Sequence, residues 1–138
     1  MEAKEKYTLN DLVDVVSRLR GEDGCPWDRK QTHETLIPCM EEECAEAVDA
    51  IRKQDMENLQ EELGDVLLQV VMHAQIGAEE GNFEIGDVID GVCRKMIRRH
   101  PHVFGNAVFS SEEEQKKYWN EIKEMEKRAP VSTGETCP

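Results

Sequence analysis

One long, uninterrupted helical segment places the strongest constraint on what this chain can fold into. From Asp55 to about Glu80 there is no proline, Gly64 is a helix-weakening residue near the middle, and residues 66–74 (VLLQVVMHA) point apolar side chains in almost every direction around the axis. A helix of that kind is buried on most of its sides. A chain of 138 residues has few other elements with which to surround it. The segment therefore predicts a helical core and an interface with a second subunit.

Gly64 adds a detail to this segment. Glycine inside a helix costs about 1 kcal/mol relative to alanine. A helix that keeps a glycine often does so because another backbone passes close to it. We therefore expect a close backbone neighbour at Gly64.

Apolar periodicity and capping signals predict four more helices. They cover approximately 9–20, 37–53, 85–99 and 111–128. The stretch GEDGCPWDRKQ between the first two is expected to be a loop because glycine and proline interrupt it, as is the stretch after Pro101. No strand-like alternation extends beyond a few residues. The prediction is one all-α domain over residues 1–128, followed by a disordered tail over 129–138.

Charge and cysteine usage exclude several classes of partner and compartment. The formal net charge of −13 argues against nucleic-acid binding, which needs a basic surface. The five cysteines are odd in number and include no C-x-x-C pair, which favours reduced thiols over a zinc finger or a disulfide framework. The N-terminus has no secretory apolar region, and no apolar run is long enough to cross a bilayer. We therefore expect a cytoplasmic protein with no nucleic-acid or membrane partner.

Two acidic pairs are placed symmetrically about one turn. Glu43 and Glu46 lie three residues apart on one expected helix, and Glu62 and Asp65 have the same spacing on the next. Gln54 is the midpoint both of positions 46 and 62 and of positions 43 and 65. In an antiparallel helix hairpin, residues equally far from the turn lie at the same height. The spacing therefore predicts that four carboxylates converge.

Converging carboxylates indicate a divalent cation. Ionised carboxylates repel one another unless a cation neutralises them, and hard ions prefer oxygen ligands. Since no histidine or cysteine lies at matching spacing, Mg²⁺ is favoured over zinc, with Mn²⁺ as an alternative. Such an ion can bridge phosphate oxygens and activate water, and Glu42, one turn before Glu46, is the candidate to orient that water. A solvated acidic helix face is the alternative interpretation.

Basic and aromatic residues supply candidate substrate contacts. Lys95, Arg98 and Arg99 are the one concentrated basic group on an expected helix, at spacings that suit a phosphate-binding patch. Cations are also favoured at a helix C-terminus without any ligand, so both interpretations stay open. Trp27 in the loop and Trp119 in the last helix are candidates to stack on a base, although packing is the commoner role of tryptophan.

Four segments in this order resemble the MazG family of nucleoside triphosphate pyrophosphohydrolases. They are LRGEDGCPWDRKQTHETL, EEECAEAVDAI, EELGDVLLQVVMHAQ and KMIRRHPHVFG, and the resemblance covers roughly residues 9–125. It implies the all-α NTP pyrophosphatase fold, a helical bundle with a central antiparallel helix hairpin, in a homodimer or larger assembly. It also implies hydrolysis of a nucleoside triphosphate to a monophosphate and pyrophosphate.

The resemblance also implies roles for individual residues. The family pattern E-E-x-x-E followed by E-x-x-D starts here at Glu42, and its metal ligands fall on Glu43, Glu46, Glu62 and Asp65. The family's nucleotide-contacting residues fall on Lys95, Arg98, Arg99 and Trp119.

Many members of this family carry two such domains in tandem, whereas this chain has one, whose CPWD and RRHPHVFG segments resemble the first copy. Tandem copies need not be equally active. A catalytically weak dimeric module that binds nucleotides or proteins is therefore the alternative function. A di-iron carboxylate bundle is disfavoured because the chain has no E-x-x-H pair.

Overall fold

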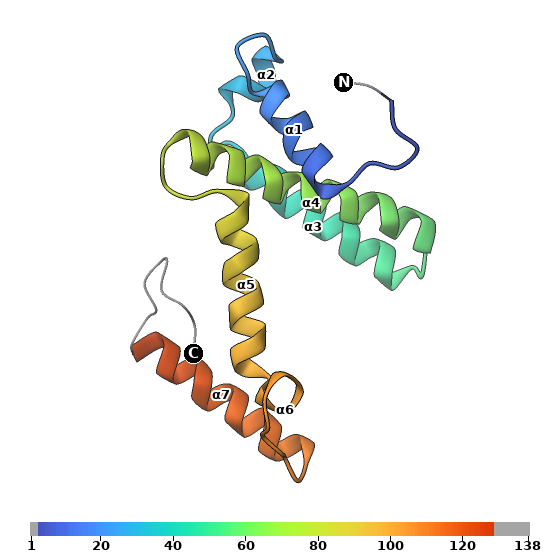
Figure 1. Cartoon of the computed structure of the whole chain (residues 1–138). Coiled ribbons are helices and arrows are strands. Elements are labelled where there is room, and N and C mark those ends of the chain that lie inside the picture. The colour runs from blue at the N-terminus through green and yellow to red at the C-terminus, as the bar shows by residue number, and fades with distance from the viewer. Residues whose placement is uncertain (1–2, 129–138) are drawn as a thin grey trace. The chain divides into compact units, whose positions relative to one another are not determined.

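The computed structural model describes residues 3–128, which are helical with short connections and contain no strand (Figure 1). The helices are α1 (Leu9–Leu19), α2 (Pro26–Lys30), α3 (Ile37–Arg52), α4 (Met56–Glu79), α5 (Ile85–Arg99), α6 (Pro101–Phe104) and α7 (Glu112–Arg128). The expected all-α class is confirmed. The expected tail, 129–138, lies outside the described residues.

The chain separates into two compact units, one up to Ile85 and one from Gly86 onward. A single domain over 1–128 stays a prediction. No helix among residues 3–128 is long and apolar enough to cross a membrane.

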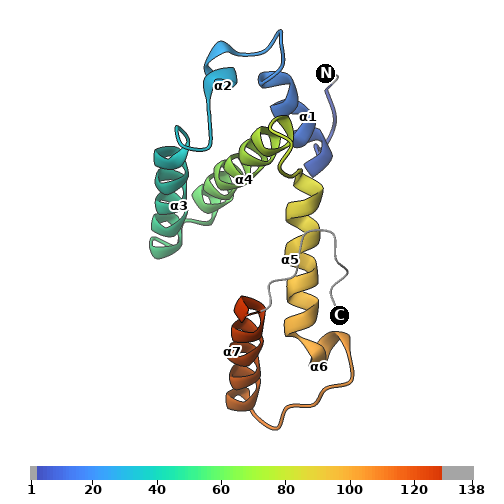
Figure 2. The same ribbon diagram turned by 90° about the vertical axis from the view of Figure 1, so that its left-hand side faces the viewer.

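Side-chain caps define the starts of two helices in the first unit. Thr8 caps α1 in a reciprocal arrangement: the backbone N–H of Asp11 donates to the Thr8 hydroxyl, and the backbone N–H of Thr8 donates to the Asp11 carboxylate. Asp55 caps α4 by accepting from the backbone N–H of Asn58. Between α3 and α4 the chain turns through Gln54, which has a φ of 55°. The two helices then pack along each other (Figures 1 and 2).

The core of the first unit forms where α1 and the residues before α3 cover the second half of α4. Its buried members are Val16, Leu36, Val71, Met72 and Ile76. The chain itself therefore buries much of the segment 66–74, for which we expected a subunit interface. Large apolar side chains are instead exposed on α3 and on the first half of α4, where Leu63 and Leu67 are examples.

The loop prediction for GEDGCPWDRKQ was wrong at Pro26–Lys30, which forms α2, and the stretch after Arg99 likewise contains α6. Both short helices have proline in their first turn, where the missing N–H costs nothing and the fixed φ favours a helix. The expected backbone neighbour of Gly64 is also absent from the described chain, because a Cβ added there meets no atom within 4 Å.

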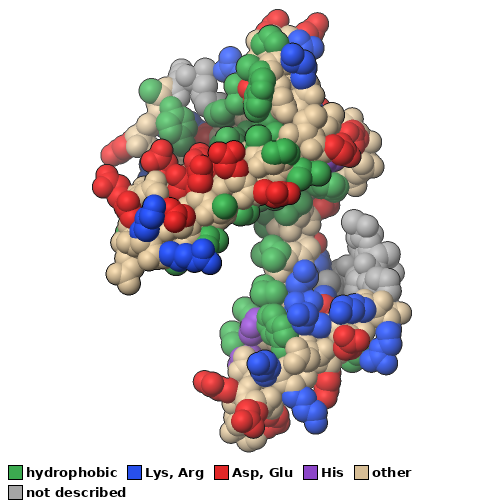
Figure 3. Space-filling view, turned by 180° about the vertical axis from the view of Figure 1, so that it is seen from behind, with side chains coloured by type: hydrophobic (Ala, Val, Ile, Leu, Met, Phe, Trp, Pro, Cys, Tyr) green, Lys and Arg blue, Asp and Glu red, His purple; other side chains and the backbone are tan. Residues whose placement is uncertain are grey.

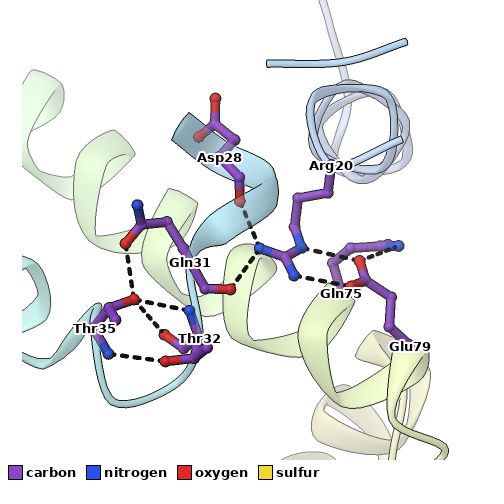
Figure 4. Close-up of polar contacts among 7 residues, drawn as sticks. All are labelled: Arg20, Asp28, Gln31, Thr32, Thr35, Gln75 and Glu79. Atoms are coloured by element: carbon purple, nitrogen blue, oxygen red, sulfur yellow. Dashed lines mark hydrogen bonds and ion pairs between the residues drawn. The ribbon is translucent and has the colours of Figure 1, made fainter. Parts of the chain in front are cut away.

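A buried arginine ties α2 to the end of α4 (Figure 4). Arg20 donates from Nε and Nη2 to the two carboxylate oxygens of Glu79, each at 2.9 Å. Its Nη1 donates to the backbone carbonyls of Asp28 and Gln31, at 2.6 and 2.9 Å. The planar guanidinium thus fixes three segments with four hydrogen bonds.

Candidate functional site

Three carboxylates from α3 and α4 meet in the first unit. Glu43, Glu62 and Asp65 each offer one oxygen, and these oxygens all lie within 4.8 Å of one another. All three side chains are half-buried. Within residues 3–128, no other group of three histidine, cysteine or acidic residues brings its ligand atoms this close. Figure 3 shows acidic side chains gathered along the helices that carry this group.

The carboxylate group contains oxygens that lack partners. One oxygen of Glu43 and one of Glu62, the Oε2 atom in each, are buried and accept no hydrogen bond. A buried acceptor without a donor is costly, and a buried anion without a cation more so. A divalent cation among these oxygens would remove both costs. Because the ligand atoms are all carboxylate oxygens, the site fits Mg²⁺ or Mn²⁺.

The electrostatics of the group also favour a cation. A hydrogen bond to Glu46, then burial, then the charges of Glu46, Asp65 and Glu43 raise the pKa of Glu62 to about 7. Burial, followed by the charges of Glu46 and Asp65, raises the pKa of Glu43. Without a cation, Glu62 therefore holds a proton up to about pH 7.

The two remaining acidic candidates lie at the edge of this group. Glu46 is exposed on α3 and makes its hydrogen bond to Glu62, outside the group of three. Glu42 is exposed as well and acts on Glu43 only through its charge.

The basic candidates lie in the second unit, against α7. Arg98 and Arg99 both bind the carboxylate of Glu126, at 3.1 and 2.8 Å, and all three side chains are largely buried. The guanidinium of Arg99 also lies over the ring of Trp119, 5.2 Å from its centroid. Lys95 is exposed on the same helix. The structure therefore brings Arg98, Arg99 and Trp119 together.

Glu126 is a residue that the sequence did not identify. It lies 27 positions after Arg99, so no local spacing links them. Hydrogen bonds from Arg99, with further help from Arg98, lower the pKa of Glu126. Figure 3 shows lysine and arginine side chains gathered over α5 and α7.

Beside this cluster the second unit has a pocket of about 400 Å³. It is lined by His100, Glu112, Gln115, Lys116 and Trp119. The Nδ1 of His100 lies 2.7 Å from the backbone carbonyl of Met96 and donates to it, which leaves Nε2 as the ring nitrogen available to other groups.

Trp27 lies apart from the carboxylates within the first unit. It is 55% exposed on α2, which Arg20 ties to Glu79 near the end of α4. Glu79 follows Asp65 by fourteen positions, about 21 Å along the helix. The structure therefore does not join Trp27 to the carboxylate group.

Comparisons with known proteins identify the family of this chain. The model of the MazG nucleotide pyrophosphohydrolase domain matches residues 31–104. The chain is 52% identical over 132 residues to the nucleoside triphosphate pyrophosphohydrolase/pyrophosphatase MazG of Thermotoga maritima, covering 94% of this chain and 50% of the relative. It is 42% identical over 120 residues to the nucleoside triphosphate pyrophosphohydrolase of Escherichia coli K12, covering 86% of this chain and 46% of the relative.

The chain spans about half the length of these curated relatives, and 26% of the uncharacterized protein YabN of Bacillus subtilis, to which it is 50% identical over 92% of its own length. Its fold is similar to the crystal structure of a MazG-related protein from Thermotoga maritima, with a TM-score of 0.69, 32% identity, and coverage of 84% of this chain and 99% of the other. This chain belongs to the MazG family of nucleotide pyrophosphohydrolase domains.

Proposed function

We propose that this chain hydrolyses nucleoside triphosphates, ribo- or deoxyribo-, canonical or non-standard, to a nucleoside monophosphate and pyrophosphate with Mg²⁺. The observation that carries the proposal is the half-buried group of Glu43, Glu62 and Asp65, with two buried oxygens that have no partner. The printed names of the relatives from Thermotoga maritima and Escherichia coli support the reaction.

In this proposal the acidic residues have separate roles in binding the metal and in orienting the water. Glu43, Glu62 and Asp65 hold the ion, and Glu46 joins them once Glu62 loses its proton. The ion, Mg²⁺ or Mn²⁺, supplies neutralisation of the triphosphate charge and lowers the pKa of a bound water. Glu42 orients the attacking water and accepts its proton, while the new bond to phosphorus forms and the α–β anhydride bond breaks.

The second unit carries further candidate residues for binding the substrate. Lys95, Arg98 and Arg99 neutralise phosphate oxygens, and Glu126 keeps the two arginines in place before the substrate arrives. The pocket beside Trp119, at about 400 Å³, is in the size range of small-molecule sites and offers an aromatic wall for a base. Trp27 is the weaker candidate because α2 is tied to the far end of α4.

We further propose that the active form is a homodimer or a larger homo-oligomer. Along α3 an exposed apolar stripe recurs at helical spacing, and large exposed apolar patches on a small protein are typical of interfaces. It consists of Ile37, Met40, Cys44, Val48 and Ile51. The cysteines of the described chain, Cys25, Cys39, Cys44 and Cys93, are free thiols, which suits a reducing cytoplasm.

The test is pyrophosphate release from a panel of nucleoside triphosphates with Mg²⁺, for the wild type and the isosteric variants Glu62→Gln and Asp65→Asn. We expect release by the wild type and a loss of roughly 100-fold or more in both variants, because each loses a charged ligand. Glu61→Gln is the matched control, since Glu61 is exposed beside Glu62 and lies outside the group.

Release that survives in Glu62→Gln and Asp65→Asn at the wild-type rate would rule out this site. A folded wild type that releases pyrophosphate from no nucleotide, with either Mg²⁺ or Mn²⁺, would leave a binding module on this fold.

A further inference from the structure

Two histidines of the first unit face each other through the same ring nitrogen. His33 lies between α2 and α3, and His73 lies on α4. Their Nδ1 atoms are 2.7 Å apart, and the rings are nearly parallel, with centroids 5.0 Å apart and an angle of 5° between the planes. Neither histidine belongs to the carboxylate group or to the basic cluster, so the pair has no part in the proposed reaction.

The surroundings of the pair determine where its hydrogen lies. Two nitrogens 2.7 Å apart need a single hydrogen between them. The Nε2 of His73 is buried and has no hydrogen-bond partner. A hydrogen on that nitrogen would be a buried donor without an acceptor, which native structures rarely contain. We therefore place the hydrogen on Nδ1 of His73, donating to Nδ1 of His33, and the hydrogen of His33 on its Nε2.

A further proton disrupts the pair when it binds His33. There the proton must go to Nδ1, and two N–H groups then point at each other. On His73 it would have to go to the buried Nε2, which keeps the shared hydrogen in place but creates a buried charged N–H without an acceptor, so this route is disfavoured. Burial and, second, the nearby His33 accordingly lower the pKa of His73.

Other charged groups around the pair do not offset this cost. The ring of Phe83 lies 6.3 Å from that of His33 and packs against Gly77 of α4. The titratable residues on the surrounding elements are Glu34 beside His33, Cys39 on α3, Arg20 after α1, Glu79 on α4 and Glu84 beside Phe83. Arg20 and Glu79 neutralise each other, and the pKa of His73 responds to burial and His33 instead.

We propose that the His33–His73 pair is a proton-controlled latch, which holds residues 32–36 on α4 while the two rings share one hydrogen and releases them when a further proton binds below neutral pH. The released residues lead directly into α3, which begins at Ile37 and carries Glu43. The latch therefore lies directly before the helix that supplies one of the candidate metal ligands.

The hydrogen bonds of Arg20 limit how far the release extends along the chain. Arg20 holds the backbone of Asp28 and Gln31, and its charged partner is Glu79 (Figure 4). The hydrogen bonds from Arg20 lower the pKa of Glu79, so this ion pair stays charged where histidines titrate. Residues up to Gln31 thus stay attached, and the release is confined to the stretch after it.

The first measurement is the tautomer of each ring in the full chain, from long-range proton–nitrogen NMR spectra of the ¹⁵N-labelled protein at pH 8. We expect the hydrogen of His73 on Nδ1 and that of His33 on Nε2. A His73 ring that carries its hydrogen on Nε2 would overturn the proposal.

The second measurement is amide hydrogen exchange from pH 8 to pH 5 at constant Mg²⁺, corrected for the intrinsic pH dependence of exchange. If release binds one proton, exchange at residues 32–36 rises by up to about tenfold per pH unit below the transition. The amide of Arg29, which donates to the carbonyl of Cys25 at the start of α2, and the amide of Val71 in the core should keep their protection and so exclude global unfolding.

Two variants separate the latch from other effects of acid. In His33→Asn the side-chain oxygen takes the place of Nδ1 as acceptor and cannot titrate, so residues 32–36 should stay protected down to pH 5. His102→Asn changes a histidine of the second unit and should keep the wild-type pH dependence. No pH-dependent release in the wild type, or the same release in His33→Asn, would rule out the latch.

Discussion

At the scale of single residues, Glu62 links the electrostatics of the carboxylate group to stability. Its pKa is raised to about 7 in the folded protein, first by the hydrogen bond to Glu46 and then by burial, from an ordinary value of 4.5. Between these two values the folded chain binds a proton that the unfolded chain has released. The contribution of Glu62 to stability is therefore fully present below pH 4.5 and is lost as the pH rises through about 7.

The raised pKa of Glu62 predicts that a rise in pH lowers the free energy of unfolding and that Mg²⁺ increases it. In EDTA, we expect the free energy of unfolding of the wild type, minus that of Glu62→Gln, to fall as the pH rises from 5 to 8.5. Urea denaturation at each pH measures it. Taking the difference removes the contributions of Asp11, Glu79 and Glu126, whose pKa values are lowered. Mg²⁺ should stabilise the wild type more at pH 8 than at pH 6, because a proton on Glu62 competes with the ion. A difference that does not change with pH would contradict the prediction.

At the scale of elements, the long helices were predictable, but contacts between distant residues were not. Apolar periodicity and capping signals predicted α1, α3, α5 and α7, and the long uninterrupted run after Asp55 predicted α4, because each of these signals extends over several turns. The short helices α2 and α6 have no room for such a repeat, and their prolines indicate a loop equally well.

In the candidate site, too, the contacts within one helix hairpin were predictable and the contacts between distant helices were not. Symmetric spacing about Gln54 predicted the approach of Glu43, Glu62 and Asp65, since two consecutive helices determine it. It also placed Glu46 level with Glu62, and the two side chains do interact, but it did not predict that Glu46 would stay outside the group of three. Local spacing also says nothing of Glu126, 27 positions from Arg99, because such a contact depends on how separate helices pack.

Alanine substitutions at two glycines of α4 should change the stability of the protein in opposite directions. Alanine at position 64 places its Cβ in open space, so Gly64→Ala should stabilise the protein by about 1 kcal/mol. A Cβ at position 77 would lie 2.8 Å from the ring of Phe83, so Gly77→Ala should destabilise it despite the better helix propensity. Thermal and urea unfolding of both variants measure this. If Gly64→Ala destabilises, another backbone passes close to it, which points to a second subunit at that surface.

At the scale of the whole molecule, the distribution of apolar side chains separates core from surface. The second half of α4 is buried within its own unit, whereas α3 leaves Val48 and Ile51 at 42% and 55% exposure. We therefore expect the subunit interface on α3 and the first half of α4, and not on residues 66–74 as the sequence had suggested. Burial of apolar surface provides about 25 cal/mol per Å², so covering this stripe with a second subunit would favour association.

A charge placed in this stripe should therefore separate the subunits without unfolding them. We expect the wild type to have at least twice the mass of one chain in light scattering coupled to size exclusion, and Val48→Glu to have the mass of one chain, because a buried carboxylate without a partner disfavours the interface. Lys53→Glu is the matched control, since it adds negative charge at the exposed C-cap of α3, about 140° around the helix axis from Val48. Helical circular dichroism should be unchanged in both variants. A wild type with the mass of one chain at micromolar concentration would contradict the homodimer, and an assembled Val48→Glu would move the interface away from α3.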